Sequence, residues 1–168
     1  TYADKNYVVE PVASYEISGL IVTHNNIAAF DDIYHDSSSV DIKDICLIWG
    51  DNVADDNFHK VSFWSEPWSC HYQTDDRDAF RNFVAEQLSN SHLLADDPEV
   101  REAIRSSRIG DQIRLKGKLI NYYPEDQPEL KRKTSTIRTD DGNGACEVIF
   151  VDSFEILGRS AEVWNQLY

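Results

Sequence analysis

The alternation of residues 112–122, QIRLKGKLINY, constrains the fold of this chain more than any other stretch. Ile113, Leu115 and Leu119 alternate with polar residues, and strands with one buried face have this period of two. Gly117 lies within the series, and a glycine inside a strand often marks a bend. The pattern predicts a long, curved strand with one face in the core and one basic face in solvent.

Shorter runs of β-branched and aromatic residues predict further strands. These runs cover 14–23, 44–50, 60–72, 133–139 and 146–157. Pro67 cannot donate a hydrogen bond to a strand ladder, so we expect a bulge, an edge or a break within 60–72. Strand-like segments therefore dominate the chain.

Two stretches have the period of amphipathic helices instead. The first is 75–89, with one apolar stripe after the cap oxygens and negative charge of Thr74, Asp75 and Asp76. The second is 98–107, where Asp97 is the predicted N-cap and Pro98 the first helical residue. A short turn at 161–167 is a further candidate.

Polar segments between these elements predict loops at 31–43 and 123–130. We interpret 89–97, SNSHLLADD, as the link between the two helices. Asn90 would then cap the first helix, and His92 would complement the negative end of its dipole.

These elements predict an α+β, β-rich fold: a small antiparallel barrel with two covering helices. Residues 110–122 resemble the strand that opens the second half of an OB-type barrel after its connecting helix. No repeat or flexible linker divides the chain. We therefore expect one domain over 1–168, with 1–12 and 159–168 as arms.

The charge of the chain restricts its partners. Thirty acidic against 16 basic residues give a net charge of −14, which repels a phosphate backbone, so we expect no nucleic-acid binding even from an OB-like barrel. No apolar run reaches the roughly 20 residues of a membrane helix, which limits membrane contact to a segment absent from this chain. Because the chain starts at Thr1 without any methionine, we expect the translation product to extend upstream.

Residues 138–150, RTDDGNGACEVIF, combine acidic residues, glycines and a cysteine in one short stretch. A calcium loop of the EF-hand type fails in both registers, because Phe150 or Ala145 falls where an oxygen ligand is required. Strand-like runs flank the stretch, so it reads as a hairpin turn, across which Arg138 and Glu147 could pair.

The three cysteines show no metal-binding or redox spacing. Cys46 and Cys70 lie on consecutive predicted strands and either form a disulfide, in an oxidising compartment, or remain two small core residues. Cys146 reads as a partly buried structural thiol. The histidines lack the spacing of a zinc site, so we expect no metal and no cofactor.

Candidate binding residues come from an aromatic run and one polar cluster. Aromatic side chains at 63–72 line either a groove or the core, and the ligand-binding candidates are Trp64, Trp68, Tyr72 and His92. For an enzyme, the catalytic candidates would be His92, Cys146, Asp141 and Arg138, gathered at one end of the barrel.

Three segments, IWGDN (48–52), SNSHLL (89–94) and STIRTDDGNGACE (135–147), resemble a group of uncharacterised bacterial envelope or membrane-associated proteins. The resemblance runs from about Tyr15 to Leu157. It implies the soluble domain of a membrane-anchored or exported protein, on the extracytoplasmic side of the envelope, with a cytoplasmic location as the alternative. It implies no activity.

We therefore expect a non-catalytic binding or assembly module for a protein partner or a small ligand. Two alternatives stay open. One is a small hydrolase-like enzyme, and the other is an extracellular domain stabilised by a metal.

Overall fold

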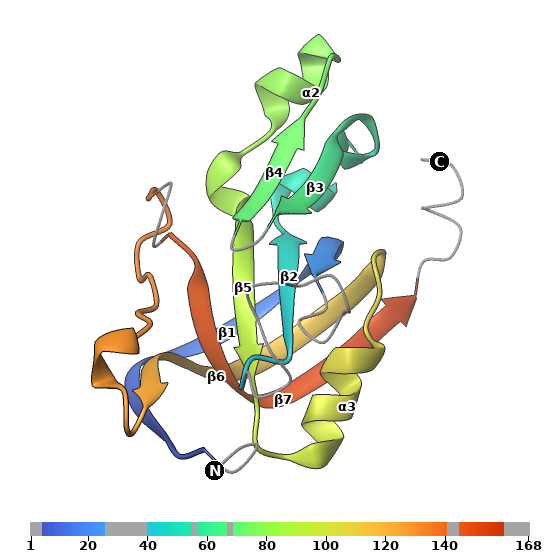
Figure 1. The fold of residues 1–168 in the computed structure, drawn as a ribbon. Coiled ribbons are helices and arrows are strands. Elements are labelled where there is room, and N and C mark those ends of the chain that lie inside the picture. The colour runs from blue at the N-terminus through green and yellow to red at the C-terminus, as the bar shows by residue number, and fades with distance from the viewer. Residues whose placement is uncertain (1–4, 26–39, 55–56, 67–68, 141–144, 160–168) are drawn as a thin grey trace.

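Strands that are far apart in the sequence form the centre of the molecule. The computed structural model describes residues 5–25, 40–54, 57–66, 69–140 and 145–159. Within them, strands pair in the order β1, β2, β5, β7, β6 and back to β1, an arrangement that we call the five-strand circuit (Figure 1). The bounds of these strands are β1 (Tyr7–Asn25), β2 (Lys43–Ile48), β5 (Leu88–Leu94), β6 (Asp111–Pro124) and β7 (Glu147–Arg159).

One strand pair differs in direction from the others. β5 and β7 are parallel, from Ser91 opposite Glu147 to Leu94 opposite Phe150, whereas the other pairs of the circuit are antiparallel. The predicted α+β, β-rich fold is confirmed, but the expectation of a wholly antiparallel sheet is wrong. The connection between β5 and β7 carries a helix and the whole of β6, and such a crossover lets two strands run in the same direction.

The long strand predicted at 112–122 is confirmed as β6, which pairs with β1 on one side and β7 on the other. Ile113, Leu115 and Leu119 are buried. The opposite face is basic, as expected, but acidic residues of the neighbouring strands offset it. Lys116 Nζ lies 3.2 Å from Glu16 Oε1, and a similar pair joins Lys118 to β7.

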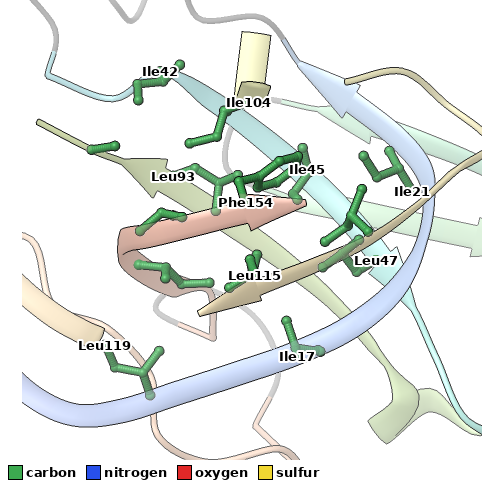
Figure 2. Packing of buried hydrophobic residues seen from close by; sticks show 14 residues of the cluster. Ile17, Ile21, Ile42, Ile45, Leu47, Leu93, Ile104, Leu115, Leu119 and Phe154 are labelled. Carbon is green, nitrogen blue, oxygen red and sulfur yellow. The ribbon is translucent and has the colours of Figure 1, made fainter. Parts of the chain in front are cut away.

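The main core fills the inner face of the circuit. Figure 2 shows apolar side chains from all five strands meeting there, with Ile104 arriving from α3 (Pro98–Ser106). The predicted capping of this helix is confirmed, because Asp97 Oδ1 accepts the backbone N–H of Glu99 at 2.7 Å and Pro98 is the first helical residue. The strand residues of this cluster include Ile17, Ile21, Ile45, Leu47, Leu93, Ile113, Leu115, Ile149, Val151 and Phe154.

A second, smaller unit projects from the circuit beyond β2 and β5 (Figure 1). It consists of β3 (Ser62–Glu66), β4 (Ser69–Gln73) and α2 (Arg77–Asn82), and we call residues 62–83 the hairpin lobe. β3 ends at Glu66 and β4 begins at Ser69, and Pro67, where a bulge, an edge or a break was expected, lies outside the described residues. Phe63 and Phe83 of the lobe pack on the outer face of the circuit, so a second apolar cluster holds the two parts together. A disulfide joins Cys70 of the lobe to Cys46 of β2, with their Cα atoms 6.0 Å apart.

The helix predicted at 75–89 is wrong beyond Asn82. It starts as expected, with Asp76 as its N-cap, but Phe83 is extended and a 3-10 turn (Ala85–Gln87) follows. The side chain of Asn52, in the short helix α1 (Asp51–Ala54), accepts the Val84 N–H at 2.9 Å and donates to the Val84 oxygen at 2.8 Å. These bonds replace those that would have continued the helix.

The predicted link at 89–97 is also wrong, because Leu88–Leu94 form β5. Asn90 is therefore not a C-cap, and His92 does not lie at a helix end. Of the two predicted covering helices, α3 packs against β7, whereas α2 belongs to the hairpin lobe (Figure 1).

The strand predicted at 133–139 does not form, so the expected hairpin lacks its first strand, and residues 141–144 of its turn lie outside the described residues. The segment follows a 3-10 turn (Pro128–Leu130) and an isolated bridge between Arg132 and Tyr122, and its Ser135 N–H donates to the Cys146 oxygen at 2.9 Å. Thr134 makes two hydrogen bonds in place of a strand ladder. Its N–H donates to Asn121 Oδ1 and its hydroxyl accepts the Val148 N–H, each at 3.1 Å. Side-chain hydrogen bonds thus hold this segment beside β6 and β7.

Some expectations fall outside the described residues. These are the turn at 161–167, most of the loop at 31–43, and residues 141–144 of the acidic stretch. Of the expected N-terminal arm, Tyr7–Pro11 pair with the end of β6. Another 3-10 turn (Asn57–Lys60) precedes β3. Across the described residues, no helix combines the length and the apolar character needed to cross a membrane.

Candidate functional site

Strand β5 carries polar side chains on both faces at buried positions. Ser89 and Ser91 lie on the inner face, whereas Asn90 and His92 lie on the outer face, and all four are buried. Buried polar groups need hydrogen-bond partners. Each face of β5 meets this need with its own cluster of residues.

On the outer face, β2, β5 and the residue directly before β7 bring together Asp44, Asn90, His92 and Cys146, which we call the His92 cluster. Asp44 lies directly opposite His92 in the β2–β5 register, and its Oδ1 is 2.6 Å from His92 Nδ1. A side-chain hydrogen bond also joins the imidazole to Cys146. Because His92 Nδ1 bonds to Asp44, we infer that Nε2 is the nitrogen that bonds to the Cys146 thiol.

The environment of His92 favours its protonated form. Burial lowers the pKa of His92, but the hydrogen bonds to Asp44 and Cys146 and the negative charges of these groups outweigh burial and raise the pKa to about 10. Asn90 Nδ2 donates to Cys146 Sγ at 3.5 Å, so the sulfur has two polar partners. A cationic imidazole beside a thiol stabilises the thiolate, which is the nucleophilic form of cysteine.

A second buried acid lies near the His92 cluster. Both carboxylate oxygens of Asp41 accept the Tyr122 hydroxyl at 2.8 Å. Burial raises the pKa of Asp41, although the positive charges of Arg132 and His92 act against this increase. The outer face near His92 therefore holds two carboxyl groups. Asp44 contacts the His92 imidazole, and Asp41 contacts the Tyr122 hydroxyl.

On the inner face, Glu147 is the centre of a different cluster. Its carboxylate accepts hydrogen bonds from Ser89 and from Arg138, so the pair suggested by the sequence does form. Arg138 also donates to the Tyr15 hydroxyl and lies over the Trp49 ring, 4.9 Å from its centroid. Burial raises the pKa of Glu147, while Ser89 and Arg138 lower it. These contacts anchor residues around 138 to the start of β7.

The four catalytic candidates are only partly brought together. His92 and Cys146 meet on the outer face, but Arg138 bonds to Glu147 on the inner face. Asp141 lies outside the described residues. Asp44 occupies the position beside the imidazole, and sequence reasoning missed it. The signal was a charged residue at the start of an otherwise apolar strand, DICLI, which needs a partner once buried.

The aromatic candidates divide between the two sides of the hairpin lobe. Trp64 stacks on His71 with ring centroids 5.3 Å apart and is 40% exposed. The Tyr72 ring packs against that of Phe83, with ring centroids 4.3 Å apart, and Tyr72 is 38% exposed. Phe80 of α2, which the sequence placed on a buried stripe, is 72% exposed. Trp68 lies outside the described residues. The lobe thus presents aromatic surface to solvent.

A cavity of about 330 Å³ lies beside α1, next to residues 18–20 of β1 and the start of β6. Its lining is largely apolar, with contributions from Leu20, Trp49, Val53, Ile113 and Leu157. None of the candidate residues from the sequence lines it. Among the described residues, no group of three or more His, Cys, Asp or Glu is arranged to hold a metal ion.

No protein-family model matches the chain, and no curated protein shows detectable similarity to it.

Proposed function

We propose that this chain is a non-catalytic binding or assembly module of a membrane-anchored or exported bacterial protein, and that the hairpin lobe is its protein-binding surface. The observation that carries the proposal is the exposure of Trp64, Tyr72 and Phe80 on one small lobe. Large aromatic residues dominate the binding energy of many protein interfaces. Trp64 and Tyr72 lie on opposite faces of the β3–β4 pair, so a partner would have to contact both faces of the lobe to bury them together.

The disulfide supports both parts of this proposal. Because Cys46 is fully buried in β2, its bond to Cys70 fixes the lobe to the circuit and limits the entropy that binding would cost. Disulfides persist mainly in oxidising compartments, which favours the extracytoplasmic location over the cytoplasmic one.

An OB-like barrel is the fold that we infer for the circuit. The five strands pair in the order β1, β2, β5, β7, β6, and helix α3 lies between β5 and β6 in the chain. Both features are consistent with the Greek-key barrel of that type. Such barrels often bind ligands on the face of their second and third strands. Here the hairpin lobe packs over part of that face, since Cys46 and Ile48 of β2 lie beneath it. We therefore place the binding surface on the lobe rather than on the strand face that it covers.

The charges favour a protein partner over nucleic acid. The net charge is −14, and lysines on the exposed face of β6 already pair with Glu16 and Asp152. A phosphate backbone would find few cations that are not offset by acids.

Pull-down from a native membrane fraction tests the proposal. The full-length protein and its Trp64→Ala and Phe80→Ser variants would be used as bait, with Leu130→Ser as the matched control, because Leu130 is 55% exposed outside the lobe. We expect a specific partner to be recovered with the wild type and the control and to fall at least about tenfold with the lobe variants. Equal recovery with all four baits would contradict the proposal.

A further inference from the structure

Strand register places two chemically active groups together on the outer face of the circuit, and a third lies at the entry to the next strand. Asp44 on β2 is opposite His92 on β5, and His92 is in turn the register partner of Val148, two residues after Cys146, which directly precedes β7. Asp44 bonds to one side of the imidazole and Cys146 to the other. The order carboxylate, imidazole, thiol is the arrangement that activates a nucleophilic cysteine.

The surroundings of Cys146 differ from those of a structural core thiol. The side chain is half-buried, and its sulfur has polar contacts with the Asn90 amide and the His92 imidazole. The titratable groups of the described residues that face the imidazole are Asp44 and Asp41 from the β2 side and Cys146 from the β7 side. Asp44 thus supports a cationic imidazole next to the sulfur.

We propose that Cys146 is a nucleophilic thiol that exchanges with an external disulfide, with His92 as the proton donor and Asp44 as the positioning residue. This activity goes beyond the proposed binding function and does not rest on it. In the reactive form, the Cys146 thiolate accepts a hydrogen bond from His92 Nε2–H. Asp44 accepts the Nδ1–H and holds the ring in place.

The exchange step balances without any further oxidant. The thiolate attacks one sulfur of the disulfide, a bond forms between Cys146 Sγ and that sulfur, and the original S–S bond breaks. Its electron pair leaves with the second sulfur, which takes the Nε2 proton and departs as a thiol. His92 then regains a proton from solvent. The products are a mixed disulfide on Cys146 and one released thiol.

The disulfide substrate must come from outside the chain. Asn90 is the register partner of Cys46 and also contacts Cys146, so one whole strand separates these two cysteines. Two strand spacings amount to about 10 Å, which exceeds the Cα separation that a disulfide can bridge, about 4.4–6.8 Å. Cys146 therefore cannot form a disulfide with Cys46 in the native fold.

The reaction can be measured by intact-mass spectrometry, with oxidised glutathione as a small disulfide and insulin as a protein disulfide. At pH 6, where an ordinary thiol is almost wholly protonated, we expect the wild type to form the glutathione adduct at least about tenfold faster than His92→Gln and Asp44→Asn. His59→Gln, which changes an imidazole outside the cluster, should react like the wild type. A mixed disulfide with either probe supports the proposal, and the faster probe identifies the source of the substrate.

The pH profile separates an activated thiol from one that is merely accessible. The wild type should react faster than the His92→Gln variant at every pH between pH 6 and pH 8, because only the wild type has the imidazole beside the sulfur. Circular dichroism would establish that each variant is folded. Wild-type and variant profiles that coincide, or a thiol that reacts only in urea, would overturn the proposal.

Discussion

Gly117 on β6 lies so close to Phe150 on β7 that a Cβ atom at position 117 would stand 2.1 Å from the Phe150 carbonyl oxygen. The pairing of these strands shifts register between Lys116 and Gly117, so the close approach coincides with an irregularity in the ladder. The neighbouring atom is backbone and cannot rotate away. This glycine is required for space rather than for an unusual backbone angle.

Gly117→Ala should lower the free energy of unfolding by about 3 kcal/mol or more, because β6 and β7 must separate locally to admit the methyl group. Gly158→Ala is the matched control, since its added Cβ would come no closer than 3.8 Å to its nearest contact, Gln112. We expect that control to change stability by less than about 1 kcal/mol. Urea unfolding of both variants tests the difference, and similar midpoints for the two would refute it.

Arg138→Ala should destabilise the fold by about 2–3 kcal/mol at pH 7, because it leaves the buried carboxylate of Glu147 without its cation. Lys116→Ala removes a comparable pair with Glu16 in which both side chains are more than half exposed, so it should cost less than about 1 kcal/mol. The cost of Arg138→Ala should also decrease at pH 4, where Glu147 can be protonated. Chemical denaturation at both pH values measures these effects, and a pH-independent cost would count against the explanation.

Cys70→Ser should lower the free energy of unfolding by about 3 kcal/mol, since the disulfide closes a loop with a sequence separation of 24. Reducing agent should lower the melting temperature of the wild type to a similar extent and leave that of the variant unchanged. Cys146→Ser serves as the control that keeps the disulfide intact. Thermal unfolding with and without reductant makes the comparison, and an equal response of wild type and Cys70→Ser would exclude the bond.

His92 should make the stability of the fold depend on pH. Its pKa in the folded state, about 10, lies above the ordinary value of 6.5, so its stabilisation is complete below pH 6.5 and is lost as the pH rises from 6.5 through 10. The difference in unfolding free energy between wild type and His92→Gln should therefore shrink by about 2–4 kcal/mol over this window.

Lys43 titrates in part of the same range, because burial lowers its pKa to about 8. Its effect has the opposite sign but is present in both proteins, so it cancels in the difference. Denaturation curves at pH 6, 8 and 10 provide the measurement. A difference that stays constant, or grows, between pH 6 and pH 10 would be incompatible with a raised pKa of His92.

Local patterns predicted those parts of the fold that local chemistry determines. The alternation at 112–122 identified β6, and Asp97 with Pro98 identified the start of α3. In both cases the residues that carry the signal are neighbours in the sequence and act through the backbone next to them.

The residues that were misassigned are those whose partners lie far away in the sequence. SNSHLL has few residues with a preference for strands, yet its polar side chains form a strand because Asp44 and Glu147 satisfy them from β2 and β7. The helix predicted beyond Asn82 ends because Asn52, about 30 positions earlier, bonds to the backbone of Val84. A pattern within one segment does not contain such partners.

The parallel pairing of β5 with β7 also has a consequence for how the chain folds. β7, the last strand of the described residues, lies between β5 and β6 in the sheet. β6 pairs on its other side with β1, about a hundred residues earlier. Until β7 has been added, β5 and β6 each expose an edge with unsatisfied backbone groups. The circuit therefore closes only when β7 pairs with both β5 and β6. This topology predicts slow refolding, with the greatest tendency to aggregate just before the last strand joins.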